Sequence, residues 1–179
     1  MIKHTRLGAV LFSITACVQA ANPSPIYVGG GIGHASFKLD CDCAMSSNAS
    51  GKATVGYSFG EVPYPGGSFV NSVELVGYSL GADFKRYNDS VRANGVGVVD
   101  ALSFKFDNFS LTGRLGLGWT RTMDYIPRET AGLMAGLGAS YTLDRHWAVN
   151  LDVDRVPTKF VVSGKQKANL VTAGASYRF

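Results

Sequence analysis

The segment that decides the fold is residues 109–121, FSLTGRLGLGWTR. Every second residue from Phe109 to Trp119 is bulky and apolar, except for Gly113, whereas the intervening residues are small or polar and include Arg114. A period of two residues is typical of a β-strand whose two faces meet different surroundings. A helix would need a period of 3.6 residues, which this segment does not have. We therefore predict a strand with one apolar face that ends in a tryptophan.

The same alternation recurs along the chain. Further strands are predicted in segments 26–37, 54–59, 72–84, 102–106, 133–143, 147–154 and 171–179. No run of eighteen apolar residues occurs, and the mean hydropathy is only +0.08. Strands of about ten residues that alternate in this way are the signature of membrane-spanning β-barrels. We predict an all-β protein, an eight-stranded antiparallel up-and-down transmembrane β-barrel.

The predicted links between strands give the barrel a direction. They are 38–53, 60–71, 85–97, 107–108, 122–130, 144–146 and 156–167, and the odd ones are longer on average. Periplasmic turns of bacterial barrels are short and outer loops are long. Both termini are therefore expected on the periplasmic side.

Segment 72–84 departs from the clean pattern. Val73, Leu75 and Gly77 alternate with a second row that contains Glu74 and Val76, so both rows carry large apolar groups. A β-bulge near Val76 would shift the apolar face halfway along the strand. We predict such a bulge.

The alternation alone does not say which face points inward, and a soluble eight-stranded barrel has the same period. Three features favour the membrane: one row is bulky while glycine and alanine fill the other, the aromatics gather near strand ends, and the chain stops on a strand. Aromatic residues at both ends of a lipid-facing band are a known feature of membrane barrels. The bulky rows are therefore expected to face lipid.

The first twenty residues are typical of a secretory signal. Lys3 and Arg6 precede a short apolar run, and Val18-Gln19-Ala20 fits a cleavage site. We predict a signal peptide over 1–20 and a barrel domain over 21–179. A second reading stays open, because Ile14-Thr15-Ala16-Cys17 loosely matches a lipoprotein processing site that would leave Cys17 at the N-terminus.

The two ends of the predicted barrel resemble a known family. Segment 169–179, NLVTAGASYRF, is similar to the last strand of outer-membrane barrels, which ends on an aromatic, and segment 26–33 is similar to the first strand of the OmpA-like and OmpX-like small barrels. The resemblance implies a barrel domain in the outer membrane of a Gram-negative cell. It also implies that Tyr177 and Phe179 form the signal that the barrel-assembly machinery reads.

The predicted inward rows contain opposite charges. Lys105, Arg114, Asp152 and Asp154 share them, and unpaired charges in a narrow lumen are costly. We predict an interior salt-bridge network that links these four residues and plugs the barrel.

Cysteines and other chemistry-bearing residues suggest little beyond this. Cys41 and Cys43 would lie in an oxidising compartment, where they either form a strained disulfide or stay reduced. The run Asp40-Cys41-Asp42-Cys43 has metal-ligand residue types but lacks a second spaced pair, so no metal and no cofactor are predicted.

Basic residues of the predicted outer loops suggest a partner. They are Lys85, Arg86, Arg92, Lys159, Lys165 and Lys167. Basic side chains bind phosphate well, so contacts with lipopolysaccharide are predicted, alongside outer-membrane lipid and a host or surface ligand held by the loops. After loss of Lys3 and Arg6 the chain keeps 15 basic and 13 acidic residues without a basic block, so no nucleic-acid partner is expected.

The predicted function is a non-enzymatic barrel with an envelope-structural or adhesin-like role. Two alternatives stay open. A small diffusion pore is one. The other is a lipid A-modifying enzyme, because His34 and Ser36 are spaced like the catalytic pair of PagL-type barrel deacylases. The pair stands here in the first strand, and no Asn follows the serine, which weakens that resemblance.

Overall fold

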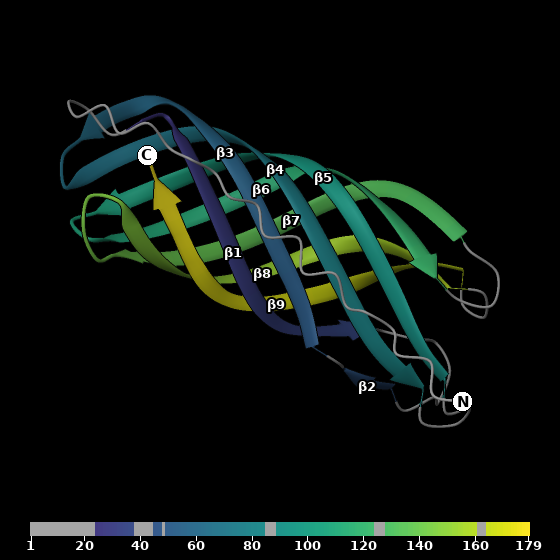
Figure 1. Ribbon diagram of the computed structural model, residues 1–179. Helices are drawn as coiled ribbons and strands as arrows, with labels where there is room; N and C mark the ends of the chain where they lie inside the picture. Colours follow the sequence, from purple (N-terminus) through teal and green to yellow (C-terminus); the bar gives the residue numbers. More distant parts are fainter. Residues whose placement is uncertain (1–23, 38–44, 48, 85–88, 124–127, 161–163) are drawn as a thin grey trace.

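The computed structural model describes residues 24–37, 45–47, 49–84, 89–123, 128–160 and 164–179 (Figure 1). The strands are β1 Ile26–Phe37, β2 Met45–Ser47, β3 Ala49–Tyr64, β4 Gly67–Phe84, β5 Asp89–Phe106, β6 Phe109–Met123, β7 Arg128–Thr142, β8 Trp147–Phe160 and β9 Gly164–Arg178. No helix among these residues is long and apolar enough to cross a membrane. The predicted signal peptide lies outside the described residues.

The eight long strands close into one antiparallel barrel, as predicted. The hydrogen-bonded order is β4-β3-β1-β9-β8-β7-β6-β5, and β5 pairs back with β4. The short β2 adds to β4 beyond the end of β3. Following paired residues once around the wall from Phe106 leads back to Val96 on the same strand, a stagger of ten residues. Such a stagger makes the strands tilt around the barrel axis.

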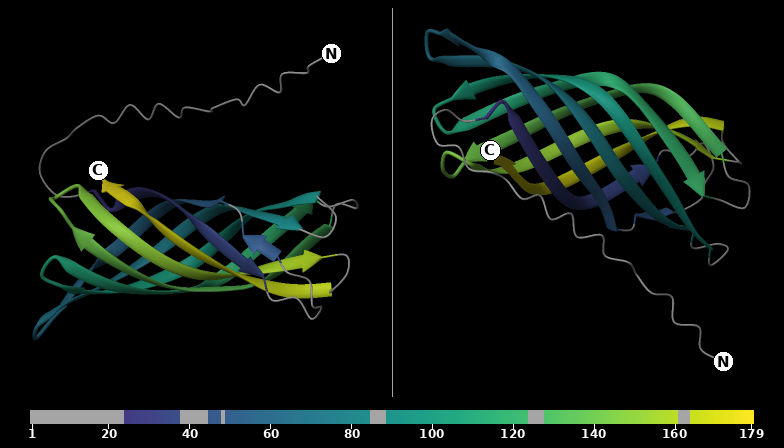
Figure 2. Two further views of the ribbon diagram at one scale, coloured as in Figure 1. Left: turned by 90° about the horizontal axis from the view of Figure 1, so that it is seen from below. Right: turned by 45° about the horizontal axis from the view of Figure 1, so that its top comes forward.

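The two ends of the barrel differ. The C-terminus and the hairpins β3–β4, β5–β6 and β7–β8 lie at one end, here called the terminal end (Figures 1 and 2). The opposite end is called the loop end. The β3–β4 hairpin projects beyond its neighbours at the terminal end (Figure 2). Its tight turn contains Gly66, whose φ of 98° favours glycine.

The strands are longer than the sequence pattern predicted. Residues 60–71, expected as a link, belong almost entirely to β3 and β4, and β5 begins at Asp89 rather than near Gly97. The polar and glycine-rich strand ends resemble loops in sequence, but they still pair with their neighbours. The expected contrast between long and short links is correspondingly weaker.

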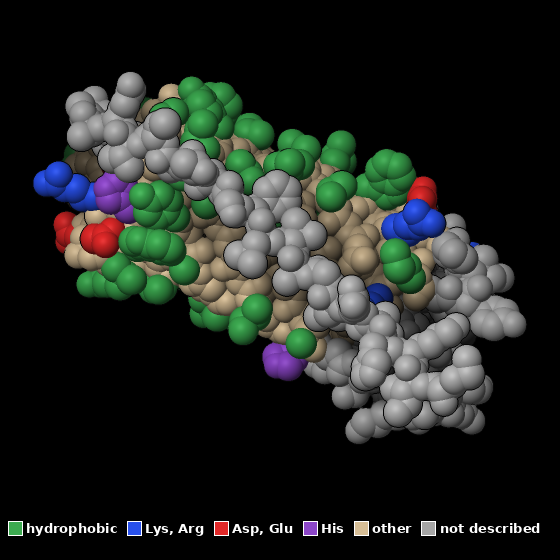
Figure 3. Space-filling model, viewed as in Figure 1, with side chains coloured by type: hydrophobic (Ala, Val, Ile, Leu, Met, Phe, Trp, Pro, Cys, Tyr) green, Lys and Arg blue, Asp and Glu red, His purple; other side chains and the backbone are tan. Residues whose placement is uncertain are grey.

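The bulky apolar rows point outward. Leu117 is 69% exposed and Leu137 is 71% exposed, and apolar side chains project from the visible wall between the charged groups at its two ends (Figure 3). On β6 the row runs from Phe109 near the terminal end to Trp119 near the loop end. A belt of this kind matches the lipid-facing band of a membrane barrel.

The bulge expected near Val76 is absent from β4. Glu74, Val76, Tyr78 and Leu80 all point inward in one regular row, and the register shift lies instead between Ser58 and Gly60 on β3. The large apolar groups that suggested a bulge are therefore interior residues.

The loop half of the lumen is filled by apolar side chains. Its members are buried: Ala35, Val76, Tyr78, Leu80, Ala93, Val99, Met134, Val156, Ala168 and Leu170. Glycines make room for the largest of them. A Cβ on Gly95, the cross-strand partner of Tyr78, would lie 2.4 Å from the tyrosine ring.

The β7–β8 ladder stops partway along the wall. In the described residues the pairing runs from Thr142–Ala148 to Ala135–Arg155. Beyond it, the loop-end parts of β7 and β8 pair with β6 and β9 but not with each other. Val156, Pro157 and Thr158 are all buried there, which indicates that β8 turns inward. The Pro157 ring lies against Gly118 and Gly132, and its carbonyl accepts a hydrogen bond from Thr120.

Candidate functional site

An ionic cluster crosses the middle of the lumen. Arg114 on β6 donates from Nε to Glu74 of β4 at 2.7 Å and from Nη1 to Asp152 of β8 at 2.8 Å. The Glu74 side chain is only 3% exposed, and its second oxygen accepts a 2.7 Å hydrogen bond from the hydroxyl of Tyr27. Arg114 thus donates one charge-assisted hydrogen bond to each of two carboxylates, and such bonds are stronger than hydrogen bonds between neutral groups.

A second cation completes the cluster on the side of β3. The Lys52 ammonium lies 2.7 Å from Asp152 Oδ2 and 2.7 Å from Asp154 Oδ2. Asp152 therefore bridges Arg114 and Lys52. The other oxygen of Asp154 is buried without a hydrogen-bond partner. Two cations face three carboxylates, so the cluster carries a net negative charge if every member is ionised.

The predicted network was wrong in one member, Lys105. Its ammonium binds Glu61 at 3.1 Å, near the terminal end, and that pair is partly exposed. The strand register explains the separation, because Lys105 lies opposite Ser110, whereas Ala101 lies opposite Arg114. Lys105 thus points into the lumen too near the terminal end to meet the aspartates. The cation that takes the expected place is Lys52.

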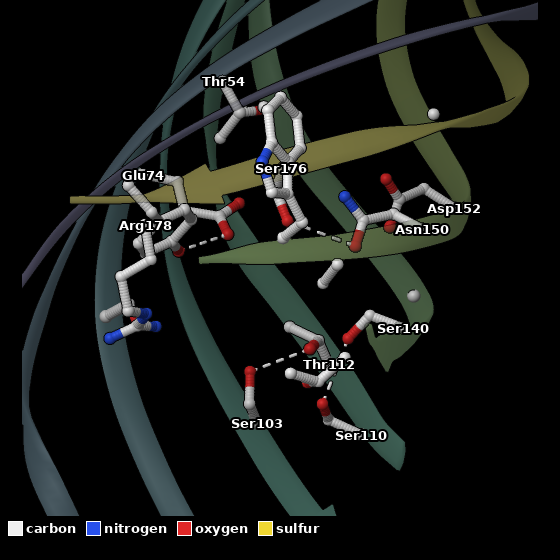
Figure 4. A pocket seen from close by; sticks show the side chains of 18 of the residues that line it. Thr54, Glu74, Ser103, Ser110, Thr112, Ser140, Asn150, Asp152, Ser176 and Arg178 are labelled. Carbon is white, nitrogen blue, oxygen red and sulfur yellow. Dashed lines mark hydrogen bonds between the residues drawn. The ribbon is translucent and has the colours of Figure 1, made fainter. Parts of the chain in front are cut away.

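A polar cavity lies between the ionic cluster and the terminal end. Its volume is about 290 Å³, and hydroxyl and amide side chains line it (Figure 4). Ser103 bonds Thr112 at 2.8 Å and Ser110 bonds Ser140 at 3.0 Å across its wall. Glu74 and Asp152 bound the cavity on the side of the ionic cluster.

The lumen therefore has three layers along its axis. The polar cavity opens toward the terminal end, the ionic cluster follows, and the apolar layer fills the loop half. Tyr78 adds a polar link within the apolar layer, because its hydroxyl lies 2.7 Å from Thr120 Oγ1.

Three members of the cluster were missed by the sequence analysis: Tyr27, Lys52 and Glu74. Lys52 stood in a predicted link, and Tyr27 lies in segment 26–37, where the run of glycines leaves no alternation to show which side chains face inward. Glu74 carried a usable signal, since an acid within an otherwise apolar strand needs a cation nearby. Extending the alternation of β3 back from Thr54 would also have placed Lys52 on the inward row.

The remaining predicted site residues are dispersed. Cys41, Cys43, Lys85 and Arg86 lie outside the described residues. Arg92 on β5 and Lys167 on β9 are exposed, while Lys159 and Lys165 are paired across the β8–β9 hairpin. His34 and Ser36 are both exposed on the outward face of β1. Among the described residues, no group of three or more His, Cys, Asp or Glu is arranged to hold a metal.

The two C-terminal aromatics take part in an aromatic cluster at the terminal end. The ring of Tyr177 lies 5.1 Å from Phe179, 5.0 Å from Trp147 and 5.6 Å from His146. Whether the assembly machinery reads Tyr177 and Phe179 stays a prediction.

Comparisons with known proteins agree with this architecture. A family model described as the outer membrane protein β-barrel domain matches residues 7–179. No sequence among curated proteins matches the chain. The fold is similar to that of Ail, the attachment invasion locus protein of Yersinia pestis, with a TM-score of 0.59, 17% identity, and coverage of 87% of this chain and 99% of Ail.

Two further solved structures share the fold. The outer membrane protein OprG of Pseudomonas aeruginosa has a TM-score of 0.57 at 17% identity, over 88% of this chain and 97% of OprG. The outer membrane enzyme PagL has a TM-score of 0.53 at 7% identity, over 84% of this chain and 97% of PagL. At such identities the likeness concerns the fold alone. The family match spans nearly the whole chain, and the chain belongs to the outer membrane protein β-barrel domain family of the bacterial outer membrane.

Proposed function

We propose that this protein is a non-enzymatic, non-conducting outer-membrane barrel that acts through its loop end on molecules of the cell surface. The terminal end is assigned to the periplasm, because it holds the tightest turns and the C-terminus. The loop end then faces the outside.

The observation that carries the non-conducting role is the layered lumen. Ions entering the polar cavity from the periplasm would meet a cluster held by five charged side chains and then a layer of buried apolar residues. Moving an ion from water into an apolar layer is costly, because nothing there replaces the water bound to the ion. This barrier does not depend on the ion pairs. The apolar layer is thus expected to keep the lumen closed to ions even without the ion pairs.

Recording across a planar bilayer tests this. The wild type is expected to show no steady conductance. A variant with all five charged residues of the cluster replaced by serine should stay closed, because the apolar layer is intact; the replaced residues are Lys52, Glu74, Arg114, Asp152 and Asp154. Steady conductance of the wild-type protein would contradict the proposal and favour a diffusion pore.

Lipopolysaccharide is the surface partner that the loop end fits best. Arg92 and Arg121 are both exposed on adjacent strands, offset diagonally, since Arg92 pairs with Met123 and Asn94 pairs with Arg121. Diagonal neighbours lie roughly 7–8 Å apart, close enough for two arginines to share one phosphate. Trp119 lies two residues from Arg121 on the same face, at the level where an aromatic anchor meets headgroups. The structural neighbour Ail has been crystallised with a heparin analogue, which is also polyanionic.

The test is binding of purified lipopolysaccharide to the folded barrel in detergent. Replacing Arg92 and Arg121 with glutamine should weaken binding at least tenfold. Arg145, exposed in the periplasmic turn, provides the matched control, and its glutamine variant should bind like the wild type. Unchanged binding by the double variant would refute this partner.

The enzyme alternative rests on the fold shared with PagL and on His34 and Ser36, which project from the same face of β1. On our proposal, mass spectra of lipid A are the same with and without the protein, and Ser36→Ala changes nothing. A loss of lipid A mass that disappears in the Ser36→Ala variant would establish the enzyme instead.

A further inference from the structure

A shallow groove runs across the outward face of β5, β6, β7 and β8. It encloses about 560 Å³, with the small residues Gly113 and Ala135 between the larger Leu102, Leu115 and Leu137. No atom lies within 4 Å of the place where a Cβ on Gly113 would stand, so the hollow is open to the surroundings. A membrane protein presents this groove to lipid or to another protein.

An acidic residue lines the groove in the middle of the apolar belt. Asp100 is exposed, and its cross-strand partner on β6 is Leu115. Leu115 stands between Phe109 and Trp119, which mark the two edges of the belt on that strand. Charged side chains facing lipid at this depth are costly, so Asp100 is expected to have a partner. No ion pair involving Asp100 occurs within the described residues.

A basic residue lines the other side of the same groove. Arg155 on β8 is exposed and is reached from Asp100 in three steps across the wall, through Leu115 and Ala135. Three strand spacings are about 14 Å, too far for a direct ion pair within one barrel. Because the strands are tilted, Arg155 also lies roughly 9 Å nearer the loop end than Asp100. An extended arginine side chain can reach an aspartate across that difference in height.

We infer that the groove is the interface of a homodimer, in which a second copy of this chain docks face to face and pairs Asp100 of each copy with Arg155 of the other. A two-fold axis along the membrane normal brings the same patch of both copies together, so residue i meets residue j twice. Because the two sides of the groove carry opposite charges, this axis places each charge of one copy opposite the opposite charge of the other copy. The small residues near the axis let the two walls approach closely, as small residues do between packed elements in lipid.

The charge pattern favours a second copy over a lipid. An acyl chain fits the apolar hollow but leaves Asp100 without a counter-charge. A lipid phosphate can reach Arg155 near the outer surface, but it would repel Asp100. A copy related by two-fold symmetry satisfies both groups at once.

The first experiment fills the groove. Full-length mature protein is folded into phosphatidylcholine vesicles, and dimerisation is measured by energy transfer between labelled copies. Gly113→Leu should weaken association at least tenfold. Gly77→Leu is the matched control, because Gly77 also faces outward with nothing within 4 Å but lies two strands away on β4; it should associate like the wild type. Heat-modifiable electrophoresis verifies that each variant is folded.

The second experiment exchanges the charges. Asp100→Arg and Arg155→Asp should each weaken association at least tenfold, because each places like charges opposite one another. The double variant carrying both changes should restore association to within about threefold of the wild type.

The outcomes separate cleanly. Recovery in the double variant, together with a difference between Gly113→Leu and Gly77→Leu, supports the dimer. A wild type that stays monomeric at every protein-to-lipid ratio overturns it. So does co-purification of a lipid that is lost in Gly113→Leu without any change in association.

Discussion

Arg114 on β6 and Asp152 on β8 form a 2.8 Å ion pair across β7, the strand that separates them. Two glycines on β7 leave room for this pair. A Cβ on Gly138 would lie 2.3 Å from Asp152 Oδ1 and 2.7 Å from an Arg114 nitrogen, and a Cβ on Gly136 would lie 2.1 Å from Asp154 Oδ1. Gly136 and Gly138 therefore leave the space that the charged side chains of β6 and β8 occupy.

Gly138→Ala is accordingly expected to destabilise the barrel. The added methyl group would displace side chains that are already held in ion pairs, at a cost of about 1–3 kcal/mol, in the range for overpacking. Urea-induced unfolding from lipid vesicles measures the change. The matched variant Gly77→Ala, which meets no atom within 4 Å, should stay within about 0.5 kcal/mol of the wild type. Equal effects of the two variants would contradict the role assigned to Gly138.

Removing the guanidinium should cost more than crowding it. Arg114→Ala would leave Glu74 and part of Asp152 buried without their cation, and breaking a buried pair in this way costs about 3–5 kcal/mol. Unfolding in urea gives the measurement, and Arg145→Ala in the exposed turn is the control.

Lysine should restore only part of that loss. Arg114 uses Nε for Glu74 and Nη1 for Asp152, two donors in a fixed planar geometry that a single ammonium does not reproduce. The Arg114→Lys variant should therefore fall between Arg114→Ala and the wild type. Full recovery by lysine would show that charge alone matters there.

The sequence was sufficient for the fold because the outward rows are nearly uniform. Residues such as Leu115 and Leu137 repeat every second position, and this period survives without any knowledge of the partner strands. Strand ends were not predictable in the same way. Residues 60–71 are rich in glycine and proline, and only their pairing across the β3–β4 hairpin shows them to be strand.

The ionic cluster was harder to derive because it depends on register. Alternation assigns Arg114 and Lys105 to the same kind of inward position, yet the β5–β6 pairing sets Lys105 opposite Ser110, four residues nearer the terminal end than Arg114. The pairing of Lys52 with residues a hundred positions away, and the inward turn at Pro157, follow from closure of the wall rather than from any local pattern.

The turn between β7 and β8 at the terminal end should respond to acid. Asp144 Oδ1 accepts 2.8 Å hydrogen bonds from the backbone N–H groups of His146 and Trp147, and these bonds lower the pKa of the carboxyl below its ordinary value. A carboxylate with a lowered folded-state pKa stabilises the protein at neutral pH. That contribution is lost as the pH falls through the folded pKa.

Asp144→Asn isolates this contribution, because it keeps the shape and removes the charge. The wild type should be more stable than the variant at pH 7, and the two should converge below the folded pKa of Asp144. The free energy of unfolding, measured at intervals from pH 7 down to about pH 2, checks this. A stability difference that does not vary with pH would count against the hydrogen-bonded carboxylate.

The gap in the β7–β8 ladder should be visible in amide hydrogen exchange. Backbone groups of β7 that point toward β8 are paired from Ala135 to Thr142, but the structure gives those of Arg128–Met134 no strand partner on that side. Every second amide in Arg128–Met134 should therefore exchange faster than the amides of Ala135–Thr142 that point toward β8, because exchange in the unpaired part requires only local opening. Nuclear magnetic resonance of the barrel in a lipid bilayer resolves the individual amides. Removing the hydrogen bond that holds the bend, by Thr120→Val, should raise exchange in Arg128–Met134 further while leaving Ala135–Thr142 unchanged. Uniform protection along β7 would mean that the ladder continues to the loop end.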